Sequence, residues 1–126
     1  MGAGLTSAIS GTVQPPVSHS GHWHAVPPTD LPSSQVLITA GDLLRALSAP
    51  VRIALVVQLC ESARCVHELV DSLGLPQPLV SQHLRILKTA GVVAGDRMGR
   101  EVRYRLVDQH LAEIVIAAVA HAAEGR

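Results

Sequence analysis

Residues 78–107, PLVSQHLRILKTAGVVAGDRMGREVRYRLV, carry the clearest structural pattern in the chain. Apolar residues recur there with the period of an α-helix, which predicts a helix near Pro78–Thr89. The residues expected on its inward face are Val80, Leu84 and Leu87. Gly91 stands where a helix commonly ends, because glycine tolerates the left-handed conformation of that position.

A β-hairpin is expected after this helix. Residues 92–94 form a short β-like run, and residues 101–107 alternate apolar with charged side chains. The glycines and the aspartate of residues 95–100 favour a turn between the two runs. The segment therefore predicts a helix followed by a two-stranded hairpin.

Two helices are expected before this segment, in a pattern that becomes helical from Gln35. Asp42 is a candidate cap for the first of them, which carries Leu43, Leu44 and Leu47 at helical spacing. Pro50 suits the first position of the second helix. Residues 51–60 are almost continuously apolar, so we expect that helix to be buried.

A short third helix and a last helix complete the expected order. Val66–Leu73 has the third helical pattern, and Gly74 suits its C-terminal cap. Asp108 is a candidate cap for a helix that continues to about Glu124. The third helix, the turn and the fourth helix make a helix-turn-helix unit, and the hairpin after it makes the fold class mainly α with a small β-hairpin, a winged helix-turn-helix.

Composition agrees with a small helical domain. The chain has 126 residues, 48% of them apolar but only 2% aromatic and none Phe, so aliphatic residues must build the core. Two cysteines are too few for a disulfide scaffold and suit a reducing compartment. The first basic residue is Arg45, and the longest apolar run, residues 114–120, is too short to span a membrane. We therefore expect a cytoplasmic protein without a membrane partner.

The first 34 residues differ from the rest. They hold five of the eight prolines, six serines and four glycines, and no periodic apolar pattern. Such a segment buries too little apolar surface to offset its ordering entropy. We therefore expect a flexible N-terminal arm over residues 1–34 and a single domain over residues 35–126. The arm carries His19, His22 and His24, which are candidate metal ligands or part of a solvated tail.

A basic segment is hidden by a formal net charge of zero. Residues 77–105 contain six basic side chains against two acidic ones. Four side chains near the start of the fourth helix occupy positions that could meet base edges in the major groove: Ser81, Gln82, His83 and Arg85. Ser, Gln and Arg are types that read such edges. The remaining basic ones suit contacts with phosphates: Lys88, Arg97, Arg100, Arg103 and Arg105. We therefore expect this segment to bind double-stranded DNA.

From about residue 41 to residue 124, the sequence resembles the ArsR/SmtB winged-helix transcriptional repressors. The resemblance rests on LSAPVR at 47–52, EL at 68–69, VSQHLRIL at 80–87, GVV at 91–93 and GREVRYRL at 99–106. It implies a homodimer that binds a palindromic operator and releases it when an effector binds. It also implies a regulator rather than an enzyme, without a small organic substrate.

The last helix carries a candidate metal site, with the spacing D-x-H-x(10)-H-x(2)-E at Asp108, His110, His121 and Glu124. Two imidazoles and two carboxylates suit tetrahedral Zn²⁺, and Co²⁺ fits the same ligands in vitro. On one helix the two histidines share a face but lie about 16 Å apart at 1.5 Å per residue. Two antiparallel copies of the helix would unite the two halves in two equal sites. The pattern also resembles the C-terminal-helix zinc site of SmtB-like members of the family.

Cys65 marks a possible second metal site. It begins the third helix beside His67 and Glu68, where other members of the family have ligands completed by an N-terminal arm. In this chain His19, His22 and His24 would complete it. Glu68 stands where aspartate is common in the family, and the arm contains no cysteine. The alternative is that Cys65 only begins the helix and that His67 is solvated.

Together these features predict a zinc-responsive transcriptional repressor, in which the metal-free homodimer binds a palindromic operator and zinc at the C-terminal helices promotes release. Three other functions are alternatives to it. Cys60 and Cys65 could sense thiol oxidation or a soft metal on the same DNA-binding fold, although Cys60 is expected in the core. The chain could instead buffer zinc. A zinc hydrolase is disfavoured, because the sequence lacks the H-E-x-x-H pairing of metalloproteases.

Overall fold

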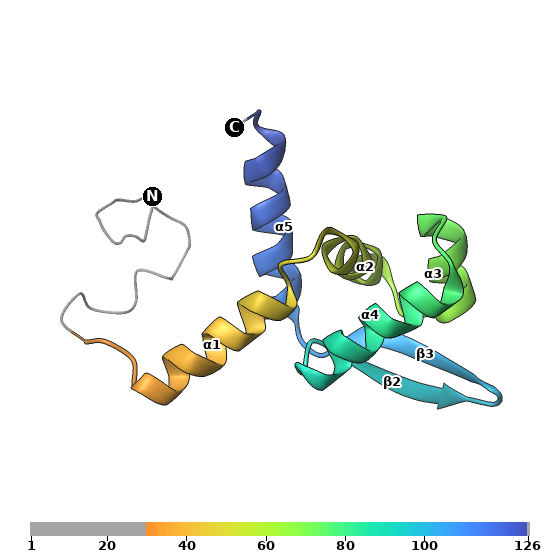
Figure 1. Ribbon diagram of the computed structural model, residues 1–126, viewed down its shortest axis with the longest axis horizontal. Helices are drawn as coiled ribbons and strands as arrows, with labels where there is room; N and C mark the ends of the chain where they lie inside the picture. The colour runs from red at the N-terminus through yellow and green to blue at the C-terminus, as the bar shows by residue number, and fades with distance from the viewer. Residues whose placement is uncertain (1–29, 126) are drawn as a thin grey trace. The chain divides into compact units, whose positions relative to one another are not determined.

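The computed structural model describes residues 30–125. This part of the chain forms five helices and three short strands. Figure 1 shows how the helices and the strands β2 and β3 are arranged. In chain order they are α1 (Ser34–Ala46), α2 (Pro50–Glu61), β1 (Arg64–Cys65), α3 (Val66–Leu73), α4 (Gln77–Thr89), β2 (Val93–Met98), β3 (Glu101–Leu106) and α5 (Gln109–Ala123). The elements from Leu37 onward belong to one compact unit. The predicted winged helix-turn-helix is confirmed, with α3 and α4 as the two helices and β2–β3 as the wing.

The core of this unit is aliphatic, as the composition predicts. Residues from α2, α3, α4, β2 and α5 meet in it. Its fully buried members are Leu55, Val56, Leu69, Val80, Leu84, Leu87 and Val92. Each buried leucine or valine removes apolar surface from water and stabilises the fold by about 1.5–3 kcal/mol. Helix α2 is less completely buried than predicted, since only Leu55, Val56 and Leu59 are buried along it.

Helix boundaries follow the predicted signals in α3, α4 and α5. Gly74 ends α3 with φ of 66° and donates its N–H to the Val70 carbonyl. Gly91 has φ of 79° just after α4. The Asp108 carboxylate accepts a hydrogen bond from the Leu111 N–H at 3.3 Å and caps α5. These positions are therefore set by local backbone chemistry that the sequence displays.

The predicted cap at Asp42 is wrong. Helix α1 begins at Ser34, the last residue of the predicted arm, and the Ser33 hydroxyl accepts a hydrogen bond from the Val36 N–H at 3.2 Å. Asp42 lies inside the helix and pairs with Arg45 at 2.8 Å. The prediction failed because most apolar residues in the first half of α1 are exposed, so no inward-facing stripe marks its start.

The sheet is larger than the predicted hairpin. Its strand order is β1-β3-β2, and both pairings are antiparallel. Strand β1 is only two residues long and pairs Arg64 with Tyr104 across the chain. Strands β2 and β3 extend to Met98 and Glu101, so the turn is shorter than the predicted one at 95–100.

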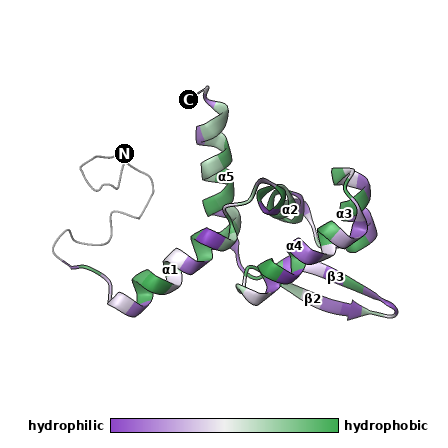
Figure 2. Ribbon diagram, viewed as in Figure 1, coloured by the Kyte–Doolittle hydropathy of each residue, from purple (hydrophilic) through white to green (hydrophobic). Residues whose placement is uncertain are grey.

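Two helices carry apolar residues that this chain leaves exposed. Figure 2 shows α5 as mainly hydrophobic, although only Leu111, Ala112 and Val115 are buried in it. Exposed apolar residues of α1 and α5 include Leu37, Ile38, Leu44, Ile114, Ile116 and Val119. No single helix within residues 30–125 is long and apolar enough to cross a membrane, and α1 with α2 passes such a test only as a pair bent by 93°.

Candidate nucleic-acid interface and metal site

Helix α4 separates a buried face from an exposed one. Val80, Leu84 and Leu87 are fully buried and fix the helix against the core. Gln82 and Arg85 are exposed on the opposite side. The helix therefore presents a polar, basic face to solvent while its apolar face anchors it.

Three other predicted DNA-contacting residues of α4 lie between these faces or at their edge. Lys88 is exposed, Ser81 is half-buried and His83 is half-buried. The Nδ1 atom of His83 lies 3.1 Å from NH1 of Arg52 in α2. Unlike Gln82, His83 therefore has a partner inside the protein.

The four wing arginines differ in their surroundings. Arg97 and Arg100 are exposed near the tip of the wing. Arg105 forms an ion pair with Asp96 across the β2–β3 ladder at 2.9 Å. Arg103 is half-buried and donates a hydrogen bond to the Ala63 carbonyl at 3.3 Å, which ties β3 to the segment before β1. The tip arginines are thus better placed than Arg103 to reach phosphates.

The predicted metal ligands lie at the two ends of α5. At the N-terminal end, Asp108 caps the helix, and His110 Nδ1 lies 3.6 Å from the Asp108 carboxylate. At the C-terminal end, His121 and Glu124 are both exposed. Eleven residues separate His110 from His121, which is about 16 Å along the axis. One chain therefore keeps the two halves apart.

No group of three or more His, Cys, Asp or Glu side chains within residues 30–125 is placed to hold a metal ion in one chain. This holds for both ends of α5 and for the surroundings of Cys65. The predicted ligands His19, His22 and His24 lie outside the described residues.

Cys65 takes part in a tight local network at the start of α3. Its backbone N–H donates to the Glu68 carboxylate at 2.8 Å, and its thiol donates to Glu101 of β3 at 3.1 Å. Glu101 also pairs with His67 at 3.6 Å. Cys65, His67 and Glu68 therefore belong to one local network that also includes Glu101 from the wing, and metal binding there stays a prediction.

This network shifts two pKa values in opposite directions. The hydrogen bond to the Glu101 carboxylate, together with burial, raises the pKa of the Cys65 thiol. The backbone N–H of Cys65, helped by the charge of Arg103, lowers the pKa of Glu68. At neutral pH Cys65 is therefore a buried, protonated thiol beside an ionised carboxylate.

Cys60 is also held as a thiol. It packs against the core from α2, as predicted, and burial raises its pKa. Thiolates are the reactive form of cysteine, so both cysteines lie in surroundings that lower their reactivity.

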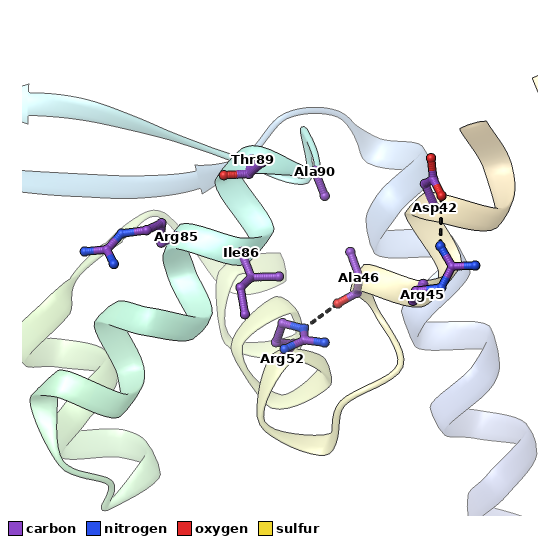
Figure 3. Close-up of a pocket in the computed structure, with 8 residues that line it drawn as sticks. All are labelled: Asp42, Arg45, Ala46, Arg52, Arg85, Ile86, Thr89 and Ala90. Carbon is purple, nitrogen blue, oxygen red and sulfur yellow. Dashed lines mark hydrogen bonds and ion pairs between the residues drawn. The ribbon is translucent and has the colours of Figure 1, made fainter. Parts of the chain in front are cut away.

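Sequence reasoning missed Arg52 and Glu101 as parts of these sites. Arg52 contacts His83 across 31 positions of sequence, and Glu101 contacts Cys65 across 36 positions. No periodicity or spacing signals such contacts, because they depend on how α2 and the wing pack. Figure 3 shows Arg52 beside the end of α1, in the hollow that α1 and α4 line.

Comparison with known proteins supports the same fold and identifies a family. Residues 49–94 match the family model described as bacterial regulatory protein, arsR family. The chain is similar to the HTH-type transcriptional repressor SmtB of Mycobacterium tuberculosis, with 71% identity over 74% of this chain and 69% of the relative.

Solved structures agree with these sequence matches. The transcriptional repressor BigR from Xylella fastidiosa has a TM-score of 0.61 and 36% identity, over 66% of this chain and 85% of that one. The homodimeric winged helix-turn-helix DNA-binding domain Mb0332 from Mycobacterium bovis has a TM-score of 0.66 at 23% identity, over 72% of this chain and 84% of that one, and supports the fold. The chain therefore belongs to the ArsR/SmtB family of winged helix-turn-helix transcriptional repressors.

Proposed function

We propose that this chain is a zinc-responsive repressor: the metal-free homodimer binds a palindromic operator, and Zn²⁺ bound by the α5 helices promotes release. The observation that carries the proposal is the placement of Asp108 with His110 at one end of α5 and His121 with Glu124 at the other. The proposal places the protein in the cytoplasm, with the DNA that it regulates.

The homodimer is supported by the apolar surface of α1 and α5. Ile116 of α5 is 50% exposed and Leu44 of α1 is 55% exposed. An apolar hollow of about 240 Å³ lies between α1, α2 and α5, with Ile53 and Ile114 in its lining. A surface of this kind marks a protein–protein contact, and the related Mb0332 domain is described as homodimeric. A second copy of this chain is the partner we propose.

Operator binding is supported by the exposed side of α4 and by the wing. In a dimer, two recognition helices enter successive major grooves about 34 Å apart. Gln82 and Arg85 would then face base edges, while Lys88, Arg97 and Arg100 would contact phosphates. A two-fold dimer reads a two-fold sequence, which is why a palindromic operator is part of the proposal.

The donor set on α5 fits Zn²⁺ only across two chains. Within one helix the halves are about 16 Å apart, whereas Zn–N bonds are about 2 Å long. An antiparallel partner helix would place His121 and Glu124 of one copy opposite Asp108 and His110 of the other. Bound Zn²⁺ would supply a cross-link between the two α5 helices. By linkage, zinc weakens operator binding only as far as it favours a dimer geometry that does not fit the operator.

Asp108 has a structural role that prepares it for this site. Its Oδ1 atom caps α5, which fixes the carboxylate at the first turn and beside His110. A ligand held by such a contact loses less conformational entropy when it binds an ion.

Two alternatives to this proposal are a thiol-based sensor and a metal-responsive switch at Cys65. The raised pKa and burial of the Cys65 thiol argue against ready oxidation. Metal binding there would have to displace the Glu101 hydrogen bond and recruit the arm histidines. These observations favour α5 as the site of the switch.

The test is operator binding by fluorescence anisotropy at fixed salt, with Zn²⁺ and then chelator added. We expect His121→Gln to bind DNA as the wild type does and to lose zinc-driven release. The matched control is His67→Gln. It removes another exposed imidazole, one that belongs to the Cys65 network, and it should keep zinc-driven release. Retained release in His121→Gln together with loss in His67→Gln would move the switch to Cys65.

A further inference from the structure

The side chain of Arg52 connects three helices. It extends from the first turn of α2 and is half-buried. Its Nε atom donates to the carbonyl of Ala46, the last residue of α1, at 2.6 Å (Figure 3). Its NH1 atom lies 3.1 Å from Nδ1 of His83 in α4. One guanidinium group therefore joins the end of α1 to the helix proposed to read DNA.

A hollow lies between α1 and α4 beside this contact. It has a volume of about 610 Å³ and is lined by residues of the last turns of both helices. Its lining includes Arg45 and Ala46 from α1, and Ile86 and Thr89 from α4. Close packing is therefore absent along the hollow, and the hydrogen bonds of Arg52 bridge the two helices beside it.

The contact also selects the tautomer of His83. An arginine side chain has five N–H donors, no acceptor, and a charge that persists at all ordinary pH values. Nδ1 of His83 must therefore accept the hydrogen bond, which places the proton of the neutral imidazole on Nε2. Any hydrogen bond from His83 to DNA is then a donated one, to a phosphate oxygen or to N7 or O6 of a purine.

We propose that Arg52 is a positioning residue for sequence recognition, acting through His83. It fixes the tautomer and ring orientation of His83 and holds α4 at a set distance from the end of α1. Since α1 carries part of the proposed dimer surface, the Arg52 side chain connects that surface to α4, the helix proposed to contact base edges. This inference rests on the DNA-binding part of the proposed function.

The matched substitutions are Arg52→Lys and Arg45→Lys. Both keep the net charge, and both sites line the same hollow. Lysine is a point charge that cannot make two hydrogen bonds in the fixed geometry of the guanidinium. Arg45 pairs with Asp42 on the exposed surface of α1, so its replacement should change nothing.

The measurement is anisotropy with two duplexes across a range of salt concentrations. One duplex is selected by the wild-type protein from a random-sequence pool, and the other is its scrambled version. We expect Arg52→Lys to bind the selected duplex about tenfold more weakly, because a charge-assisted hydrogen bond is lost. Binding to the scrambled duplex and the salt dependence should stay unchanged, since the number of phosphate contacts is the same.

Three results would overturn the inference. Arg52→Lys could bind the selected duplex as tightly as the wild type does. It could instead lose affinity equally for both duplexes with a changed salt dependence, which would make Arg52 a phosphate contact. In a double-mutant cycle, the losses from Arg52→Lys and His83→Ala could add fully, whereas action through His83 predicts that the double variant binds no worse than His83→Ala alone.

Failure of the proposed function gives a different pattern. If the wild-type protein selects no sequence and binds both duplexes alike, DNA recognition itself is absent. Thermal melting of each variant shows whether it is folded at the assay temperature. Binding to the scrambled duplex is a second control, because an unfolded variant would lose that binding as well. His83→Asn is a further probe, since it keeps an acceptor near the position of Nδ1 and removes the Nε2 donor.

Discussion

Replacing Asp108 separates its structural role from its proposed metal role. Its carboxylate caps α5 by accepting the Leu111 N–H at 3.3 Å. Loss of an N-terminal cap costs about 0.5–2 kcal/mol, and the length of this hydrogen bond places the cost near the lower end. Asp108→Ala should therefore destabilise the protein by about 0.5–1 kcal/mol, or about 2–8 °C in Tm for a domain of this size.

Serine keeps the cap without the carboxylate. Serine and aspartate are equally good N-caps. The free energy of unfolding of Asp108→Ser should therefore lie within about 0.5 kcal/mol of the wild-type value. Both variants should lose zinc-driven operator release, because neither offers a carboxylate ligand. Gln109→Ala, an exposed substitution in the same turn, should change neither property.

Thermal melting in chelator, at fixed protein concentration, measures the effect of each substitution on Tm without contributions from bound metal or from changes in protein concentration. Fluorescence anisotropy with added Zn²⁺ measures the effect of each substitution on operator release. The reasoning about the cap is refuted if Asp108→Ala melts at the wild-type temperature. The ligand role is refuted if Asp108→Ser releases DNA at the same zinc concentration as the wild type.

Three further predictions concern the fold and the wing. Leu84→Ala empties a fully buried site in α4 and should lower the free energy of unfolding by about 2–5 kcal/mol in chemical denaturation. Gly95→Ala would bring a Cβ to 2.7 Å from Val102 Cγ1 in the facing strand. The free energy of unfolding, measured from circular dichroism melts, should therefore fall by about 1–3 kcal/mol, and unchanged melts would contradict the strand pairing. Glu101→Gln replaces the carboxylate that raises the pKa of the Cys65 thiol, first through its hydrogen bond and then through its charge. Iodoacetamide should therefore modify native Cys65 faster, and an unchanged rate would argue against that cause.

Much of the fold could be predicted because its signals are local. Gly74 and Asp108 stand at helix ends that require their backbone chemistry, and Val80, Leu84 and Leu87 mark the buried face of α4 by spacing alone. Helix α1 gave no such signal at its start, where its apolar residues stay exposed and where a second copy is the proposed partner.

The contacts that complete the sites were not predictable from the sequence. Strand β1 exists only because Arg64 pairs with Tyr104, far along the chain. Arg52 with His83 and Cys65 with Glu101 are likewise tertiary contacts. The proposed α5 ligand set is visible in the sequence as a spacing. Its two halves cannot meet within one chain, because the rise of one helix keeps its ends apart.

The measurement that tests the central claim most directly is complementation between two defective chains. One chain carries Asp108→Ser with His110→Ala, and the other carries His121→Gln with Glu124→Gln. Each homodimer lacks half of the ligands at both sites, whereas a mixed dimer has one complete site, formed by the intact end of each chain. Mixed dimers purified with two different tags are titrated with Zn²⁺ against a competing chelator. We predict one tightly bound zinc per mixed dimer and none in either homodimer; equal zinc binding by all three, or none by the mixed dimer, would contradict a site shared between two α5 helices.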